Sequence, residues 1–241
     1  MESTYLIQAT PTQVEWLAFA TNQAMRIHIG QLTDPLTVLV NFMEAYRRHH
    51  EGRTCPSEVE ERLEQLSRTC WHNTPNGYAY SEKARTLWEM YQKFKEQVGS
   101  TAAASFTLNR PQLTTLRDAL EQAARLRVGQ TVASLLEEML SAYRRSHDKE
   151  PQAPNQIHLI RQQISTELDL LHQCCWNMPA SSSYGLGYDT QSDGCWSMYE
   201  VIRHAVWREN HPDRSAGDRL SVASDPPMRL GEEPLLRVGR R

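Results

Sequence analysis

The amino-acid sequence predicts a mainly α-helical protein of two tandem-repeated four-helix modules, with short β-strands and a pseudo-two-fold arrangement. Two observations lead to this prediction. Apolar residues recur at the spacing of amphipathic helices. A series of short motifs also occurs twice in the same order, which is typical of a tandem duplication. The paired motifs are Arg26–Gln31 with Arg125–Gln130, Ala45–Arg48 with Ala142–Arg145, Cys70-Trp71 with Cys175-Trp176, and Trp88–Tyr91 with Trp196–Tyr199.

The repeat also sets the expected domain boundaries. The first module should span 1–98 and the second 105–209, each near the common size of a small domain. Residues 99–104 contain only Gly, Ser, Thr and Ala and therefore suit a linker. The segment 210–241 is polar and rich in proline, so we expect a loosely attached tail.

Each module begins with a strand, an N-cap residue, a helix and a glycine that can end the helix in the left-handed conformation. In the first module these are Tyr5–Ala9, Thr10, the run from Pro11, and Gly30. In the second module they are Ser105–Leu108, Asn109, the run from Arg110, and Gly129. The remaining helices are expected at Leu32–Tyr46, Ser57–Cys70 and Glu82–Val98, and at Val132–Tyr143, Asn155–Cys175 and Asp193–Glu209.

Composition and charge disfavour several classes of function. The net charge of −3 and the 23% of charged residues are ordinary for a globular protein, so nucleic acid is disfavoured as the main partner. No apolar run reaches the roughly 18–20 residues of a membrane span, and no signal-peptide pattern is present, so we expect a cytoplasmic protein. The cysteines include no C-x-x-C pair, which suits reduced thiols and disfavours a metal site.

Motifs of the common enzyme classes are missing from the sequence. It contains no G-x-G-x-x-G, no G-x-x-x-x-G-K-[ST], no G-x-S-x-G and no H-E-x-x-H. We therefore expect no catalytic residues and no cofactor. A hydrolase assembled from scattered residues stays open as the weakest interpretation.

Arginine residues near helix ends are the first candidates for ligand binding. Arg26 and Arg125 end the first helix of each module and are followed by Gln31 and Gln130, and Arg144 ends the next helix of the second module. A guanidinium fork binds a phosphate or carboxylate through two parallel hydrogen bonds. The structural alternative is that these cations only stabilise the negative pole of a helix.

Aromatic and basic residues of the second module complete the predicted site. Tyr184 lies in a Gly- and Ser-rich loop where its ring can stack on a nucleobase, and Arg203-His204 follow an apolar pair on the last helix. For Arg203 and His204 the alternative is a structural pair that contacts no ligand. The tryptophans expected in the core or between the two halves are Trp71, Trp88, Trp176 and Trp196.

Several motifs of the second module, within 105–238, resemble a family of small tailed-phage proteins. They are Arg125-x-x-x-Gly129-Gln130, Ser183-Tyr184-Gly185 and Val201-Ile202-Arg203-His204. The first module departs from this pattern, because Tyr78-Ala79-Tyr80 stands in place of the Ser-Tyr-Gly loop. The resemblance implies a phage protein that acts in the host cytoplasm, and it implies no particular activity.

These observations together predict a non-enzymatic binder that sequesters a small anionic ligand, with a nucleotide signal of host defence as the ligand class. The second module should bind better, because it alone combines Arg125, Gln130, Tyr184, Arg203 and His204. The alternative is an interaction protein that blocks a host defence protein through its aromatic loops. The modules should form a pseudo-dimer within the chain, and association of chains into a homo-oligomer stays open.

Overall fold

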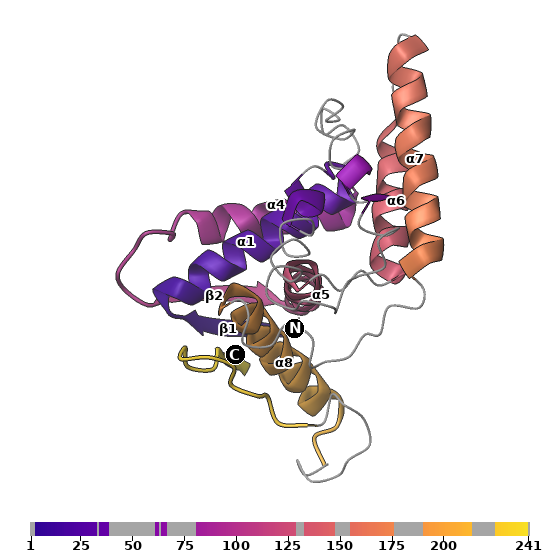
Figure 1. The fold of residues 1–241 in the computed structure, drawn as a ribbon. Helices are drawn as coiled ribbons and strands as arrows, with labels where there is room; N and C mark the ends of the chain where they lie inside the picture. The colour runs from indigo at the N-terminus through magenta and orange to yellow at the C-terminus, as the bar shows by residue number, and fades with distance from the viewer. Residues whose placement is uncertain are drawn as a thin grey trace. The chain divides into compact units, whose positions relative to one another are not determined.

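The computed structural model describes residues 3–32, 34–38, 61–62, 64–66, 81–128, 133–147, 155–175, 190–213 and 225–240. Within these ranges the chain is mainly helical with a three-stranded sheet, which confirms the predicted fold class at this level (Figure 1). In chain order the elements are β1 Thr4–Ala9, α1 Pro11–His28, α4 Glu82–Lys95, β2 Ala104–Asn109, α5 Arg110–Arg127, α6 Ala133–His147, α7 Asn155–Cys175, α8 Thr190–Asn210 and β3 Arg237–Arg240.

The chain divides into two compact units. Unit 1 comprises Met1–Asn22, Thr86–Ala124 and Leu186–Arg241, and unit 2 comprises Gln23–Arg85 and Arg125–Gly185. Helices α1, α4 and α5 contribute residues to both units. Each unit also takes segments from both predicted modules, so the units do not follow the boundaries 1–98 and 105–209. Those module boundaries stay a prediction about the repeat.

The sheet of unit 1 has the strand order β2-β1-β3, and β1 is antiparallel to both of its neighbours. Ile7 on the central strand lies opposite Phe106 on β2 and Val238 on β3. Side chains alternate across a strand, so Tyr5 and Ile7 are buried whereas Gln8 is exposed. One face of the sheet therefore belongs to the core of unit 1.

Helices α1 and α5 both begin with a reciprocal capping box. Thr10 Oγ1 accepts a hydrogen bond from the Gln13 N–H at 3.2 Å, and Gln13 Oε1 accepts one from the Thr10 N–H at 3.0 Å. On α5, Asn109 Oδ1 and Gln112 Oε1 accept the corresponding bonds at 2.9 and 3.0 Å. Each box satisfies N–H groups that have no partner within the helix. The predicted N-caps Thr10 and Asn109 are confirmed.

A glycine on α8 lets an indole ring lie directly on that helix. Gly194 is buried, and a Cβ atom built on it would lie 2.0 Å from Cζ3 and 2.1 Å from Cε3 of Trp16 on α1. Trp16 itself is only 7% exposed. Elsewhere in unit 1, Phe94 on α4 and Phe106 on β2 pack edge to face with ring centroids 4.8 Å apart. These aromatic contacts hold α1, α4 and α8 to the rest of unit 1.

Several contacts attach the C-terminal segment 225–240 to the start of α1. Thr10 Oγ1 donates to Glu233 Oε2 at 2.7 Å, and Gln13 Nε2 donates to the Pro234 carbonyl at 2.6 Å. Strand β3 then pairs with β1. Residues 225–240, a part of the predicted tail 210–241, are therefore attached to both α1 and β1.

Unit 2 has an apolar core to which both halves of the chain contribute. In this unit α6 and α7 lie side by side (Figure 1). The core residues are Ile27, Leu32, Leu36, Leu66, Leu126, Leu135, Leu136, Met139, Leu140, Tyr143, Ile164 and Leu168.

Candidate functional site

The turn at the end of α1 carries two residues of the predicted site, Arg26 and Gln31. Gly30 has a φ of 78°, its N–H donates to the Ile27 carbonyl at 3.0 Å, and the Gln31 N–H donates to the Arg26 carbonyl at 2.8 Å. These two hydrogen bonds around a left-handed glycine form a Schellman motif. The prediction that Gly30 ends the first helix is confirmed, whereas Gly129 lies outside the described residues.

The same turn lies close to α6. Ser146 Oγ is 2.5 Å from the Ile29 carbonyl oxygen and 2.8 Å from that of Ala142. A Cβ atom on Gly30 would lie 2.6 Å from Ser146 Oγ and 3.1 Å from the Cα atom of Tyr143. Glycine is therefore required here both by its conformation and by the space available.

Arg26 extends from the last turn of α1. Its Nη1 atom is 3.0 Å from Asp34 Oδ2 and 3.4 Å from Gln31 Oε1. The side chains of Arg26 and Asp34 are 32% and 47% exposed. Within the described residues, Nε of Arg26 is buried and has no hydrogen-bond partner. The structure thus brings the predicted pair Arg26 and Gln31 together, and it places beside them Asp34, which sequence reasoning missed.

His28, on the same turn of α1, belongs to a second charged cluster. It is 5% exposed, and its Nε2 atom is 2.9 Å from Oε1 of Glu138 on α6. Lys83 Nζ lies 3.5 Å from the same oxygen. Burial raises the pKa of Glu138. The hydrogen bond to His28, the charge of His28 and the nearby Lys83 outweigh this effect, and together they lower the pKa of Glu138 from 4.5 to about 2. The cluster therefore holds Glu138 in its charged form.

We expect Glu138 to make unit 2 less stable in acid. Because its folded-state pKa is lowered, its contribution to stability is full above pH 4.5 and is lost as the pH falls toward about 2. The loss should be on the order of 2–3 kcal/mol. Urea unfolding followed by circular dichroism across this pH range measures it, and Glu138→Gln should remove most of the change.

Glu137→Gln is the matched control for this prediction. Glu137 is the exposed neighbour of Glu138 on α6 and does not belong to the cluster. Its replacement by Gln therefore changes the net charge by the same amount and leaves the cluster intact. This variant should keep the acid sensitivity of the wild type. If both variants lost stability in acid to the same extent as the wild type, the contribution assigned to Glu138 would be wrong.

Two further predicted arginines also belong to unit 2. Arg125 lies in the last turn of α5, is partly buried and makes interactions of its own. Arg144 on α6 is exposed; its Nη2 atom donates to Asp169 Oδ2 at 2.6 Å, and its Nε atom donates to Ser165 Oγ at 3.1 Å. Its guanidinium is therefore already engaged by α7. The other predicted ligand-binding residues, Gln130 and Tyr184, lie outside the described residues.

Arg203 and His204 lie on α8 in unit 1. The Arg203 guanidinium is 5.2 Å from the centroid of the Tyr199 ring, and its Nη2 atom is 3.9 Å from Glu200 Oε1. The His204 ring stacks on Trp207 with centroids 6.0 Å apart. Among the described residues, Nε of Arg203 and Nδ1 of His204 are buried without a hydrogen-bond partner. The predicted ligand-binding residues are thus divided between the two units.

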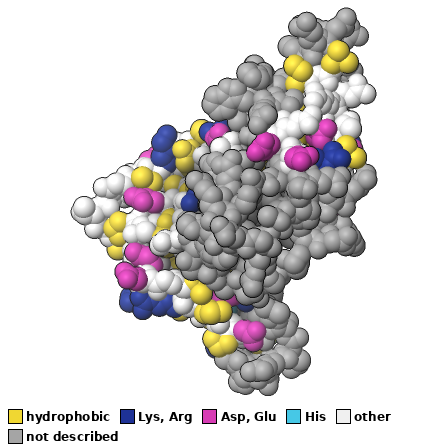
Figure 2. Space-filling view, viewed as in Figure 1, with side chains coloured by type: hydrophobic (Ala, Val, Ile, Leu, Met, Phe, Trp, Pro, Cys, Tyr) yellow, Lys and Arg dark blue, Asp and Glu magenta, His cyan; other side chains and the backbone are white. Residues whose placement is uncertain are grey.

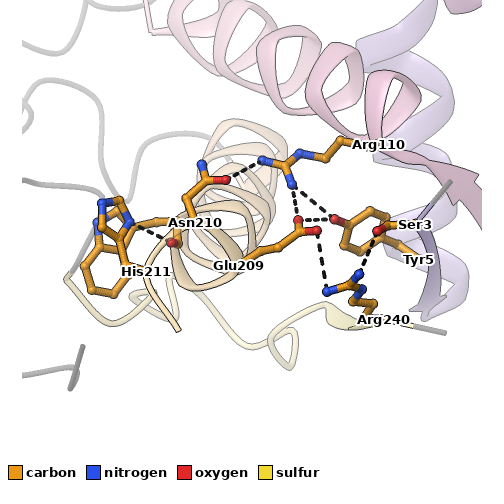
Figure 3. Close-up of polar contacts among 8 residues, drawn as sticks. Ser3, Tyr5, Arg110, Glu209, Asn210, His211 and Arg240 are labelled. Atoms are coloured by element: carbon orange, nitrogen blue, oxygen red, sulfur yellow. Dashed lines mark hydrogen bonds and ion pairs between the residues drawn. The ribbon is translucent and has the colours of Figure 1, made fainter. Parts of the chain in front are cut away.

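A polar cluster around Glu209 in unit 1 was not predicted from the sequence. Tyr5 on β1 and Arg110 on α5 both donate to Oε2 of Glu209 on α8, and Arg240 on β3 lies 3.8 Å from its Oε1 (Figure 3). Burial and the hydrogen bond to Glu209 raise the pKa of Tyr5, despite the opposing effect of Arg110. The cluster joins four elements around one carboxylate. Its members are too far apart in the chain for a sequence motif to connect them.

The exposure of tryptophan on α4 differs from the prediction. Trp88 is 40% exposed, so a position in the core is wrong for it, and a position between the two halves stays a prediction. The reason is that Leu87 and Met90 face the core from this helix, which turns Trp88 outward. Trp196 on α8 is partly buried. The other two tryptophans of the prediction, Trp71 and Trp176, lie outside the described residues.

Acidic and basic side chains lie interspersed on the face shown in Figure 2. In the part of the chain that the structure describes, no three His, Cys, Asp or Glu side chains gather as metal ligands would. None of the helices in these ranges is long and apolar enough to cross a membrane. Cys195 is a buried free thiol.

The Arg26 turn combines a partly exposed guanidinium, an ion pair with Asp34 and a buried N–H without an acceptor among the described residues. A comparison of the chain with known proteins found no protein-family model, no curated protein and no solved structure that matches it.

Proposed function

We propose that the chain is a non-enzymatic binder of a small anionic ligand. The principal anion contact that we propose is Arg26 of the first module, in unit 2, and not the second-module set expected from the sequence, because Gln130 and Tyr184 lie outside the described residues and Arg144 is engaged by Asp169. The observation that carries the proposal is the incomplete set of hydrogen bonds at this guanidinium. Nη1 is shared between Asp34 and Gln31, while Nε is buried without a partner in the described ranges. A buried donor without an acceptor costs about 1–3 kcal/mol, so an anion that accepts from Nε would recover that cost.

Asp34 pairs with Nη1 of this guanidinium. The Nε–H forms a fork with Nη2 on the other side, so a phosphate that accepts two parallel hydrogen bonds there would bind beside Asp34 and not in its place. Both members of the Arg26–Asp34 ion pair are partly exposed, and exposed pairs contribute only about 0–1 kcal/mol to stability, so this pair holds the guanidinium only weakly.

A nucleotide signal of host defence is the ligand class that we propose. Its phosphates supply the negative charge that Arg26 attracts. The resemblance of the second-half motifs to small tailed-phage proteins supplies the context in which removal of such a signal is useful. Sequestration requires affinity and no catalysis, which fits a sequence without the common catalytic motifs.

The same proposal includes a tandem duplication whose copies form a pseudo-dimer. Matched features support it. The capping boxes of α1 and α5 use corresponding residues of the two copies. Strands β1 and β2 open the two copies and pair with each other in antiparallel fashion, as equivalent strands do across a two-fold axis. Each compact unit also takes segments from both copies.

Calorimetry with a panel of nucleotides tests the anion site. Arg26→Ala should weaken binding about tenfold or more, because one charge-assisted hydrogen bond is worth roughly 1.5–3 kcal/mol. Asp34→Asn should act in the opposite direction and tighten binding, because it removes the negative charge beside the ligand. Mass spectrometry of molecules released when the purified protein is denatured would identify the ligand.

Arg85→Ala is the matched control, because Arg85 is an exposed arginine of the same unit. It should leave the affinity unchanged. Equal losses in Arg26→Ala and Arg85→Ala would mean that only the total charge matters. A protein that is empty after purification and binds no nucleotide of the panel would remove the proposal.

A further inference from the structure

Helix α4 carries a row of two aromatic rings and a cation, here named the α4 ladder. It consists of Trp88 and Lys95, which are exposed, and Tyr91, which is partly exposed. The rings of Trp88 and Tyr91 have centroids 5.5 Å apart and an interplanar angle of 44°. Lys95 Nζ lies 5.7 Å from the centroid of the Tyr91 ring. Trp88 is 40% exposed, although most large apolar side chains of the described residues are buried. A tryptophan held in one position at the surface is a common anchor for a protein partner.

Helix α8 carries a row of the same design. The rings of Trp196 and Tyr199 have centroids 5.0 Å apart and an interplanar angle of 47°, and the Arg203 guanidinium lies 5.2 Å from the Tyr199 centroid. The order of the three residues and their spacing along the helix are the same as on α4. Helix α8 therefore shows what binds beside a row of this kind within the protein, namely the C-terminal segment.

The C-terminal segment binds α8 next to this row. The Met228 N–H donates to Glu200 Oε2 at 2.7 Å, and the Leu230 N–H donates to Ser197 Oγ at 3.0 Å. Glu200 Oε1 also accepts a hydrogen bond from the indole N–H of Trp196 at 3.2 Å. Alternate backbone N–H groups point to one side in an extended segment. The segment thus binds α8 through its backbone, and Glu200 links it to the aromatic row.

The corresponding positions on α4 have no such partner among the residues that the structure describes. By the repeat, Glu89 corresponds to Ser197 and Gln92 to Glu200, and both side chains on α4 have oxygens that can accept an N–H group. Glu89 is exposed and Gln92 is partly exposed. Among the described residues, no segment takes the place on α4 that 228–230 take on α8.

We propose that the α4 ladder, with Glu89 and Gln92 beside it, binds an extended segment of another protein. The partner segment donates two backbone N–H groups, two residues apart, to Gln92 and Glu89, and an apolar side chain packs on the Trp88 ring. Its chemistry is apolar-basic-apolar, as in Met228-Arg229-Leu230. This surface lies in unit 1 and does not depend on the anion site proposed in unit 2.

Charge favours a basic residue at the centre of the partner segment. Glu89 presents a carboxylate where α8 has the neutral hydroxyl of Ser197. Hydrogen bonds to an ionised acceptor are about twice as strong as those between neutral groups. Glu89 can therefore accept a stronger hydrogen bond from the partner than Ser197 accepts on α8, and its carboxylate can pair with a basic side chain of the partner.

A labelled peptide with the sequence of residues 225–235 serves as the probe, and fluorescence anisotropy with the full chain measures its binding. Trp88→Ala should weaken binding by about tenfold or more, because it removes the central aromatic anchor. Glu89→Ala should weaken it by about threefold to tenfold. Lys93→Ala is the matched control, because Lys93 is an exposed residue of α4 outside the ladder. It should change the affinity less than about twofold.

Two other occupants are distinguished by further variants. If the peptide exchanges with the chain's own C-terminal segment on α8, Ser197→Ala and Glu200→Gln will change its binding while Trp88→Ala will not, and the proposal is overturned. If the chain associates with itself in sedimentation velocity and Trp88→Ala abolishes this, a second copy is the occupant and the proposal of another protein is wrong. An absence of binding at about 1 mM peptide would also overturn it.

Discussion

Gly194→Ala should destabilise the protein by roughly 3 kcal/mol, at the upper end of the cost of overpacking a core. Within a helix this substitution normally stabilises by up to about 1 kcal/mol, because alanine has the higher helix propensity. Here the sign is reversed, since the new methyl group would overlap Cζ3 and Cε3 of Trp16 at 2.0 and 2.1 Å. The indole is rigid and almost fully buried, so it cannot move aside. Urea unfolding measures the change.

A second substitution at the contact separates this overlap from other effects. Trp16→Leu alone should destabilise by a few kcal/mol, because it leaves a cavity. In the double variant the alanine methyl group can occupy part of that space, so the double change should cost less than the sum of the single changes. A Gly194→Ala protein as stable as the wild type would show that α8 does not pack on Trp16 as described.

Gly30→Ala should destabilise unit 2 by roughly 2–4 kcal/mol, in two parts. A residue with a side chain pays about 1–2 kcal/mol for the left-handed conformation. The added methyl group must also fit 2.6 Å from Ser146 Oγ and 3.1 Å from the Cα atom of Tyr143, which requires α6 to shift. The free energy of unfolding from urea titration gives the total.

Gly99→Ala separates the two parts. Gly99 has a φ of 84°, similar to that of Gly30, but a Cβ atom on it would meet nothing within 4 Å. Only the conformational cost of about 1–2 kcal/mol should appear there. Combining Gly30→Ala with Ser146→Ala should recover part of the steric cost. Equal effects at Gly30 and Gly99 would show that the close approach of α6 contributes nothing.

The starts and ends of the helices could be predicted because their signals are local. Thr10 and Gln13 bond to each other across one helical turn, and Asn109 and Gln112 do the same. Gly30 ends α1 through hydrogen bonds that reach back no further than Arg26. Interactions of this range are visible in the sequence before the fold is known.

The candidate site could be predicted only in part, because side-chain pairing depends on tertiary packing. Arg26 and Gln31 are joined by a local turn, and the sequence shows both. The sequence does not distinguish an arginine that is paired within the chain, as Arg144 is with Asp169, from one that keeps a donor free for a ligand. Trp88 illustrates the same limit, since its exposure depends on which side of α4 meets the core.

The central position of β1 affects how the protein folds during synthesis. Strand β1 is made first, but its partner β2 follows about 100 residues later and β3 about 230 residues later. At a translation rate of 5–20 residues per second, roughly 10–50 s pass before β3 emerges. During this time at least one edge of β1 presents unpaired N–H and C=O groups, to which strands of other chains can bind. The nascent chain is therefore prone to aggregate through β1 in the interval before β3 has been made.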